Sequence, residues 1–241
     1  MTQKTQEPVD PLASAPPLQR PKWRMGLAPV LLLATSVGAL VQTLRNTWLS
    51  DDLFITLRYC DNLLAGQGAV YNVGEYVEGY THFLWFVILT FGRLLALPPE
   101  VLGRFLGLPF FLGSIVLLSQ LGRRLFPGSR ARWGVPVAAM AWGLSIDAQL
   151  YTSGGLETIF FTFLLLLGFD LCTRPPSNRR SAAAGVVFAL ATLTRPEGLL
   201  LSVLAAAGIG LLQRNVRASM RFVLFWSLMT APHLVFRLLY Y

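Results

Sequence analysis

Residues 26–52, GLAPVLLLATSVGALVQTLRNTWLSDD, contain the two features that decide the fold. The run Gly26–Leu44 carries no charge. It is long enough to cross a bilayer as a helix that rises about 1.5 Å per residue. The adjacent carboxylates Asp51 and Asp52 follow this run, so they are predicted to lie in water but against the membrane. We therefore expect an integral membrane protein with ionisable groups at the mouth of its first span.

The composition supports a membrane protein. The 241 residues are 54% hydrophobic and only 13% charged, with a mean hydropathy of +0.55, whereas soluble domains are about a quarter charged. The net charge of +8 comes from arginines clustered between apolar runs, which is typical of orientation signals and argues against nucleic-acid binding. Cys60 and Cys172 match no metal-ligand spacing. Residues 1–24, polar and proline-rich, are predicted to form a disordered basic cytoplasmic tail.

Residues 25–241 are predicted to form one all-α, polytopic membrane module. Seven apolar runs are expected to span: Gly26–Leu44, Val101–Leu121, Trp133–Leu150, Leu156–Cys172, Ser181–Thr194, Glu197–Leu212 and Phe222–Leu239. An eighth run, His82–Leu97, is short, holds Arg93 near its middle and ends at Pro98-Pro99. We expect it to lie in the interface as an amphipathic juxtamembrane helix.

The charges sort by side in this topology. It places 14 of the 20 Lys and Arg residues on one side and nine of the 12 acidic residues on the other. The positive-inside rule makes the basic side cytoplasmic, with the N-terminus inside. Residues 45–100 then form a first outer loop that carries juxtamembrane helices. The polar motifs all fall at the outer face, which predicts a single extracytoplasmic site.

The strongest motif is the pair Asp51 and Asp52. Neighbouring carboxylates repel each other, so one of the two tends toward a raised pKa, which suits proton abstraction from a hydroxyl. The pair also has the chemistry to hold a divalent cation. A third interpretation is structural, because Ser50-Asp51-Asp52 would cap a short helix well. The sequence leaves all three open.

The motif VEGYTH (77–82) gathers groups that contact sugars. Glu78, Tyr80, Thr81 and His82 supply hydrogen-bonding and stacking side chains. The alternative is an ordered loop anchored by interfacial tyrosines.

Further charged candidates lie near predicted helix ends. Glu157 and Glu197 open the fourth and sixth spans, where an acid favours the helix dipole and needs no function. Arg195 beside a helix N-terminus would clamp a phosphate, unless it pairs structurally with one of these acids. Arg58 lies about two helical turns beyond Asp51, so it is positioned for a salt bridge or for a phosphate.

Together these motifs resemble a known family. DDLFITLRYCDNLLAGQGAVYNVGEYVEGYTHFLW (51–85), GLET (155–158) and LTRPEGLLL (193–201) are similar to bacterial integral-membrane glycosyltransferases of the GT-C class. That class includes cell-wall arabinofuranosyltransferases that use a polyprenyl-phosphate sugar. The resemblance runs from about Arg45 to the end of the chain. Family members usually continue past RLLYY (237–241), so the chain looks like the N-terminal half of a longer enzyme.

The resemblance implies an inverting sugar transfer at the outer face of the bacterial cytoplasmic membrane. The donor would be a polyprenyl-phosphate sugar and the acceptor a cell-envelope glycan or lipid. Asp51 or Asp52 would be the catalytic base, and Arg195, with Arg58 or Arg237, would stabilise the leaving phosphate. No cofactor is required, with a divalent cation at the aspartates the only candidate. The alternatives are an inactive truncated homologue that acts as a membrane scaffold, or a transporter fragment.

Overall fold

A computed structural model describes residues 27–126 and 136–241. Within these ranges all regular secondary structure is helical, so the predicted all-α class is confirmed. Residues 1–24, expected to form a disordered tail, lie outside the described residues. The same holds for two members of the predicted basic clusters, Arg130 and Arg132.

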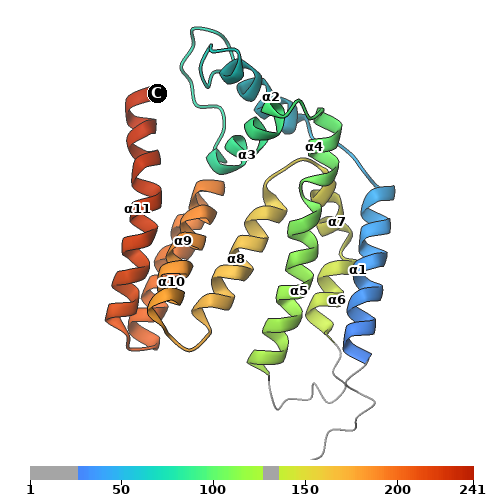
Figure 1. Ribbon diagram of the computed structural model, residues 1–241, viewed down its shortest axis with the longest axis vertical. Coiled ribbons are helices and arrows are strands. Elements are labelled where there is room, and N and C mark those ends of the chain that lie inside the picture. The colour runs from blue at the N-terminus through green and yellow to red at the C-terminus, as the bar shows by residue number, and fades with distance from the viewer. Residues whose placement is uncertain (1–26, 127–135) are drawn as a thin grey trace, which may run out of the picture.

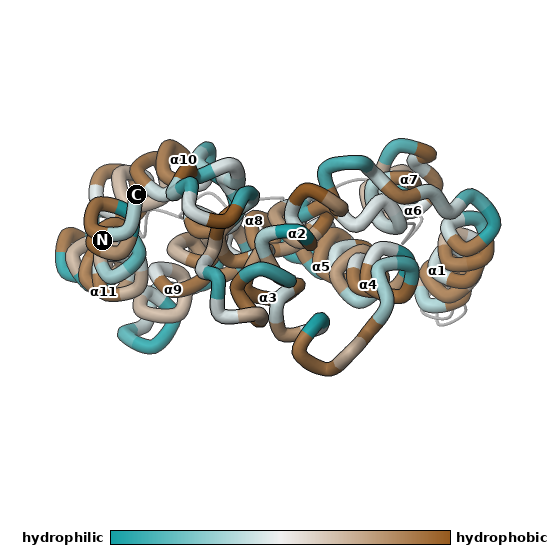
Figure 2. The backbone as a smooth tube through the Cα atoms, turned by 90° about the horizontal axis from the view of Figure 1, so that it is seen from above, coloured by the Kyte–Doolittle hydropathy of each residue, from teal (hydrophilic) through white to brown (hydrophobic). Residues whose placement is uncertain are grey.

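Most helices run along the long axis of the molecule, and two short ones lie across one end (Figure 1). The axial helices are α1 (Leu27–Arg45), α4 (Pro99–Phe105), α5 (Leu108–Leu125), α6 (Val137–Leu144), α7 (Ile146–Ser153), α8 (Thr158–Cys172), α9 (Asn178–Thr194), α10 (Glu197–Ala207) with the π-helix η3 (Gly208–Leu212), and α11 (Val216–Tyr240). The two across the end are α2 (Asp51–Leu64) and α3 (Phe83–Leu94). Seen from this end, α9, α10 and α11 lie on one side of an elongated array and α1, α6 and α7 on the other (Figure 2).

Three of the described helical segments are long and apolar enough to cross a membrane: Leu27–Arg45, Pro99–Leu125 and Val216–Tyr240. A fourth is added if α7 and α8, bent by 115°, count as one broken span. The predicted count of seven spans is therefore not shown.

The continuous helix expected over the predicted span Trp133–Leu150 is corrected by the structure. The structure divides its described part into α6 and α7 at Ser145, because the Ser145 hydroxyl accepts a hydrogen bond from the Ala148 N–H at 3.4 Å and starts a new helix. By contrast, residues 82–97 form the short helix α3 rather than a candidate span, as expected.

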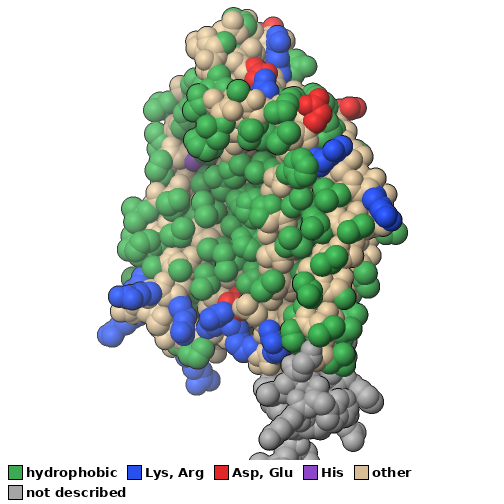
Figure 3. Space-filling view, turned by 45° about the vertical axis from the view of Figure 1, so that its right-hand side comes forward, with side chains coloured by type: hydrophobic (Ala, Val, Ile, Leu, Met, Phe, Trp, Pro, Cys, Tyr) green, Lys and Arg blue, Asp and Glu red, His purple; other side chains and the backbone are tan. Residues whose placement is uncertain are grey.

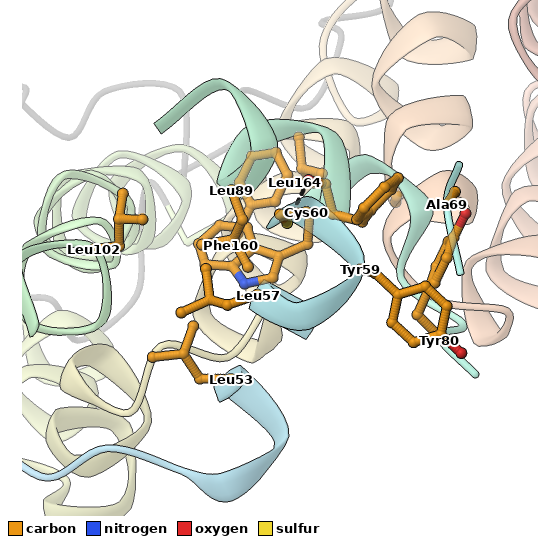
Figure 4. Packing of buried hydrophobic residues seen from close by; sticks show 13 residues of the cluster. Leu53, Leu57, Tyr59, Cys60, Ala69, Tyr80, Leu89, Leu102, Phe160 and Leu164 are labelled. Atoms are coloured by element: carbon orange, nitrogen blue, oxygen red, sulfur yellow. Dashed lines mark hydrogen bonds between the residues drawn. The ribbon is translucent and has the colours of Figure 1, made fainter. Parts of the chain in front are cut away.

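A hydrophobic core joins the crossing helices to the axial ones. Leu53, Leu57 and Cys60 recur at i, i+4 and i+7 on α2, so they share one face, and all three are buried. Figure 4 shows this face directed at Leu89 of α3 and Phe160 of α8. The amphipathic pattern of α2 is thus satisfied by protein, which fixes its first turn relative to α8.

Charge is sorted between the two ends. Figure 3 shows Lys and Arg side chains gathered at the end opposite α2 and α3, below a hydrophobic belt. The basic end holds Arg123, Arg124, Arg174, Arg179, Arg180, Arg214, Arg217 and Arg221. The acid nearest them, Asp170, is buried and forms ion pairs of 2.9 Å with Arg124 and 2.7 Å with Arg174. The end with α2 and α3 carries acids of these two segments and of the adjacent helix ends, among them Asp51, Asp52, Glu78, Glu100, Glu157 and Glu197.

Candidate active site

The site begins at the first turn of α2. Ser50 is the N-cap, and its hydroxyl accepts a hydrogen bond from the Asp52 N–H at 3.3 Å. Asp51 and Asp52 are the first two helical residues and both are exposed. The capping interpretation is confirmed for Ser50. Neither aspartate carboxylate has a hydrogen bond or ion pair within residues 27–126 and 136–241, so both are available to a substrate.

The loop before α8 supports this turn. The Gly154 carbonyl accepts a hydrogen bond from the Ser50 N–H at 3.1 Å. Gly155 has φ +81°, and a Cβ there would lie 2.6 Å from Leu53 Cδ2. Only glycine fits this backbone conformation at this distance. Its carbonyl also accepts a hydrogen bond of 2.9 Å from the indole of Trp85. The motif that contains Gly155 therefore brings Glu157 under α2 and α3.

Arg195 is placed by a proline-induced break. Residues before proline disfavour the helical conformation, and Arg195 adopts φ −149°, ψ 140° between α9 and α10. Gly198 allows α10 to return closely over α9, because a Cβ there would lie 2.6 Å from the Ala191 carbonyl carbon. The sequence Arg-Pro-Glu-Gly thus forms a tight connection between α9 and α10, and this connection places Arg195 at this end of the bundle.

The structure connects four of the predicted site residues in a chain. His82 Nδ1 lies 3.9 Å from Glu157 Oε2, and Glu157 Oε1 lies 3.5 Å from Arg195 Nη1. Arg195 Nη2 lies 3.3 Å from Glu197 Oε1. The Arg195 guanidinium also lies 5.9 Å from the ring centroid of Phe161. The structural pairing of Arg195, left open by the sequence, is formed with both acids.

His82 links this chain to α2. Its Nε2 lies 2.9 Å from the hydroxyl of Thr56, which donates to the backbone carbonyl of Asp52 at 3.0 Å. Burial lowers the pKa of His82, while the charges of Glu157 and Asp52 act to raise it and that of Arg195 to lower it further. The pKa of His82 therefore depends on charged groups from three separate elements.

A second polar group lies at the end of α11. The Arg237 Nε donates to Glu78 Oε2 at 2.9 Å. The hydroxyl of Tyr241 donates to the carbonyl of Ala69 at 2.8 Å and lies 3.2 Å from the hydroxyl of Tyr80. Tyr80 is 2% exposed and stacks on Phe86 with ring centroids 4.6 Å apart. The Tyr80 ring therefore packs in the core and anchors the loop between α2 and α3.

Two predicted residues stand apart from these groups. Arg58 donates to the carbonyl of Tyr71 in the folded loop at 3.4 Å and has no carboxylate partner among the described residues. Thr81 is exposed, with no side-chain hydrogen bond to any described residue. As for a metal, the described residues contain no group of three or more His, Cys, Asp or Glu side chains that could hold an ion. A cation at the two aspartates stays a prediction.

The residue that sequence reasoning missed is Thr56. It is 3% exposed and joins the Asp52 turn to His82. Its position four residues after Asp52 in a helix was the available signal, since i and i+4 residues share a face.

Comparisons with known proteins confirm the resemblance to cell-wall arabinofuranosyltransferases. The chain is 30% identical over 207 residues to the terminal beta-(1->2)-arabinofuranosyltransferase of Mycobacterium tuberculosis, a match that covers 80% of this chain and 33% of that protein. A protein of the same name from Corynebacterium glutamicum is 58% identical over 38 residues, 16% of this chain and 6% of that protein. The chain thus spans about a third of the length of the first relative. No protein-family model and no solved structure matches it.

Proposed function

We propose that this chain carries the catalytic end of a glycosyltransferase of the cell envelope. It would move a sugar from a polyprenyl-phosphate donor to a glycan or lipid acceptor, with inversion at the anomeric carbon. The observation that carries the proposal is the grouping of Asp52 on α2, Glu157 and Arg195 around His82, on which the charges of all three act, at one end of an apolar bundle. Similarity to proteins named arabinofuranosyltransferases supports it.

Inversion follows from a single displacement. Asp51 or Asp52 would remove the proton from an acceptor hydroxyl, whose oxygen attacks the anomeric carbon as the bond to the phosphate oxygen breaks. The products would be the new glycoside and polyprenyl phosphate. Both carboxylates are exposed and have no partner within residues 27–126 and 136–241, which suits a general base that must reach an incoming hydroxyl.

Arg195 would stabilise the leaving phosphate, whose charge grows in the transition state. Its guanidinium is about one-third exposed and is shared between Glu157 and Glu197 at distances longer than a close charge-assisted hydrogen bond. A phosphate therefore competes with two loosely held carboxylates. Arg237 is held by Glu78 and Arg58 by a backbone carbonyl, so both would have to leave a present partner.

The polar surface around these residues would bind the sugar and the acceptor. Glu78, Thr81 and Glu197 are the proposed contacts, with His82, Glu157 and Tyr80 shaping the surface behind them. The reaction would take place at the outer face of the cytoplasmic membrane. The basic residues at the opposite end support this orientation through the positive-inside rule.

The test is sugar transfer and release of polyprenyl phosphate by membranes that contain the protein. Removing a general base costs about 10²–10⁴-fold in rate. We therefore expect a loss of this size in one of the single variants Asp51→Asn and Asp52→Asn, whichever removes the base, and in the double variant. Glu100→Gln is the matched control, because Glu100 is also an exposed acid in the first turn of a helix at this end. Transfer that survives the double variant, or its absence from the wild type, contradicts the proposal.

A further inference from the structure

Glu157 is shared between a histidine and an arginine. Its Oε2 lies 3.9 Å from His82 Nδ1 and its Oε1 lies 3.5 Å from Arg195 Nη1. Both distances exceed the roughly 2.7–2.9 Å of a charge-assisted hydrogen bond, so the carboxylate is close-bonded to neither. Its side chain is 13% exposed, which limits competition from water. A small shift toward one partner therefore weakens its hold on the other.

Thr56 anchors the histidine ring. Its hydroxyl lies 3.0 Å from the Asp52 carbonyl oxygen and 2.9 Å from His82 Nε2, so the ring is tied to α2 by this nitrogen. Nδ1 then faces Glu157. The neutral ring carries a proton on one of its two nitrogens, and a second proton makes it a cation. That charge would turn the weak contact with the Glu157 carboxylate into an ion pair.

The groups around the ring agree with a neutral resting state. Asp52 on α2, Glu157 at the start of α8 and Arg195 between α9 and α10 face His82, and the ring of Tyr80 lies 6.3 Å away. Burial is the largest influence and lowers the pKa of His82 below its usual value of 6.5. The imidazole is then neutral at pH 7, and it gains its proton only below its usual pKa.

We propose that His82 is a positioning residue that sets, through Glu157, how far Arg195 is available to the donor phosphate. This role rests on the function proposed above. With His82 neutral, Glu157 stays with Arg195 and offsets its charge. With His82 protonated, Glu157 moves toward the imidazolium and Arg195 is released to bind the phosphate.

The test is binding of a farnesyl-phosphoryl pentose to the purified protein in detergent between pH 5.5 and 7.5. This probe is a phosphodiester, so its own charge is constant over that range. We expect the wild type to bind about three- to tenfold more tightly at pH 5.5, the scale of one partly screened ion pair. His82→Gln should bind equally at both pH values. Glu157→Gln should bind at pH 7.5 as tightly as the wild type does at pH 5.5.

His233→Gln is the matched control, because His233 is the chain's other histidine. It lies on α11, where its ring stacks on Phe83 of α3. It should keep the wild-type pH dependence, and thermal unfolding would verify that every variant is folded. In transfer assays the same pH effect should appear in kcat/KM for the donor, because Arg195 binds the donor phosphate and also stabilises the charge that grows on it in the transition state. A purely structural role of His82 would not produce this pH dependence.

The proposal is overturned if His82→Gln keeps the pH dependence, if Glu157→Gln binds more weakly than the wild type at pH 7.5, or if the wild type does not bind the probe. Because binding needs no turnover, these results are distinct from those of the aspartate variants. Loss of transfer in those variants, together with a flat binding profile in the wild type, would retain the glycosyltransferase and reject the positioning role.

Discussion

The indole Nε1 of Trp85 donates a hydrogen bond of 2.9 Å to the carbonyl oxygen of Gly155, 70 positions later in the chain. Trp85 is 2% exposed and belongs to the hydrophobic core cluster drawn in Figure 4. The bond ties α3 to the loop that leads into Glu157. The candidate site thus depends on a packed element that contributes no charge to it.

Trp85→Phe should lower the stability of the protein. The substitution leaves the buried Gly155 carbonyl without its partner, at a cost of about 1–3 kcal/mol. Thermal unfolding in detergent would measure the change. Trp48→Phe is the control, because Trp48 makes an equivalent bond to the carbonyl of Leu150 but is 42% exposed. An equal loss in the two variants would contradict the importance of burial here.

Gly155→Ala should destabilise the protein more than Gly66→Ala. Both residues have positive φ, +81° and +76°, so both substitutions strain the backbone by about 1 kcal/mol. Only the Cβ at Gly155 meets a neighbour, Leu53 Cδ2 at 2.6 Å, whereas that at Gly66 meets open space. Crowding of a packed core adds about 1–3 kcal/mol. Equal unfolding temperatures would show that Leu53 yields without cost.

At the basic end, Arg124→Gln combined with Arg174→Gln should cost more than the sum of the single changes. Asp170 is 3% exposed at its side chain and is paired with both arginines. Either arginine alone compensates the carboxylate, but removal of both strands a buried charge, at about 3 kcal/mol. A double-mutant cycle on unfolding free energy measures the coupling. Additive effects would contradict this account.

The thiol of Cys60 should resist alkylation in the folded protein. Cys60 is fully buried on α2, and burial raises its pKa from 9.0 to about 11. A raised pKa keeps the thiol protonated at pH 7.5, and the thiolate is the reactive form. In a Cys172→Ser background, maleimide labelling should therefore require denaturant. Rapid labelling without denaturant would show that α2 detaches from the core.

Local pattern was sufficient for much of the helical fold. The uncharged run that becomes α1, the Pro98-Pro99 break before α4 and the arginine clusters each act within a few residues, and the structure agrees with them. The break within the predicted span Trp133–Leu150 was missed for a reason of the same scale. Hydropathy averages over the run, whereas the cap at Ser145 is a single side-chain hydrogen bond.

What the sequence by itself determined is the all-α class, several of the helix ends and the charged groups that gather at each end, because hydrophobic period, proline and charge act locally. The tertiary structure decided which charges meet. Glu78 and Arg237 are 159 positions apart, and Glu157 takes both His82 and Arg195 as partners. Asp51 and Asp52 have no hydrogen-bond or ion-pair partner for their carboxylates in the part of the chain that the structure describes. Such pairings depend on how helices pack and which rotamers fit between them. Those are properties of the folded chain that no local pattern contains.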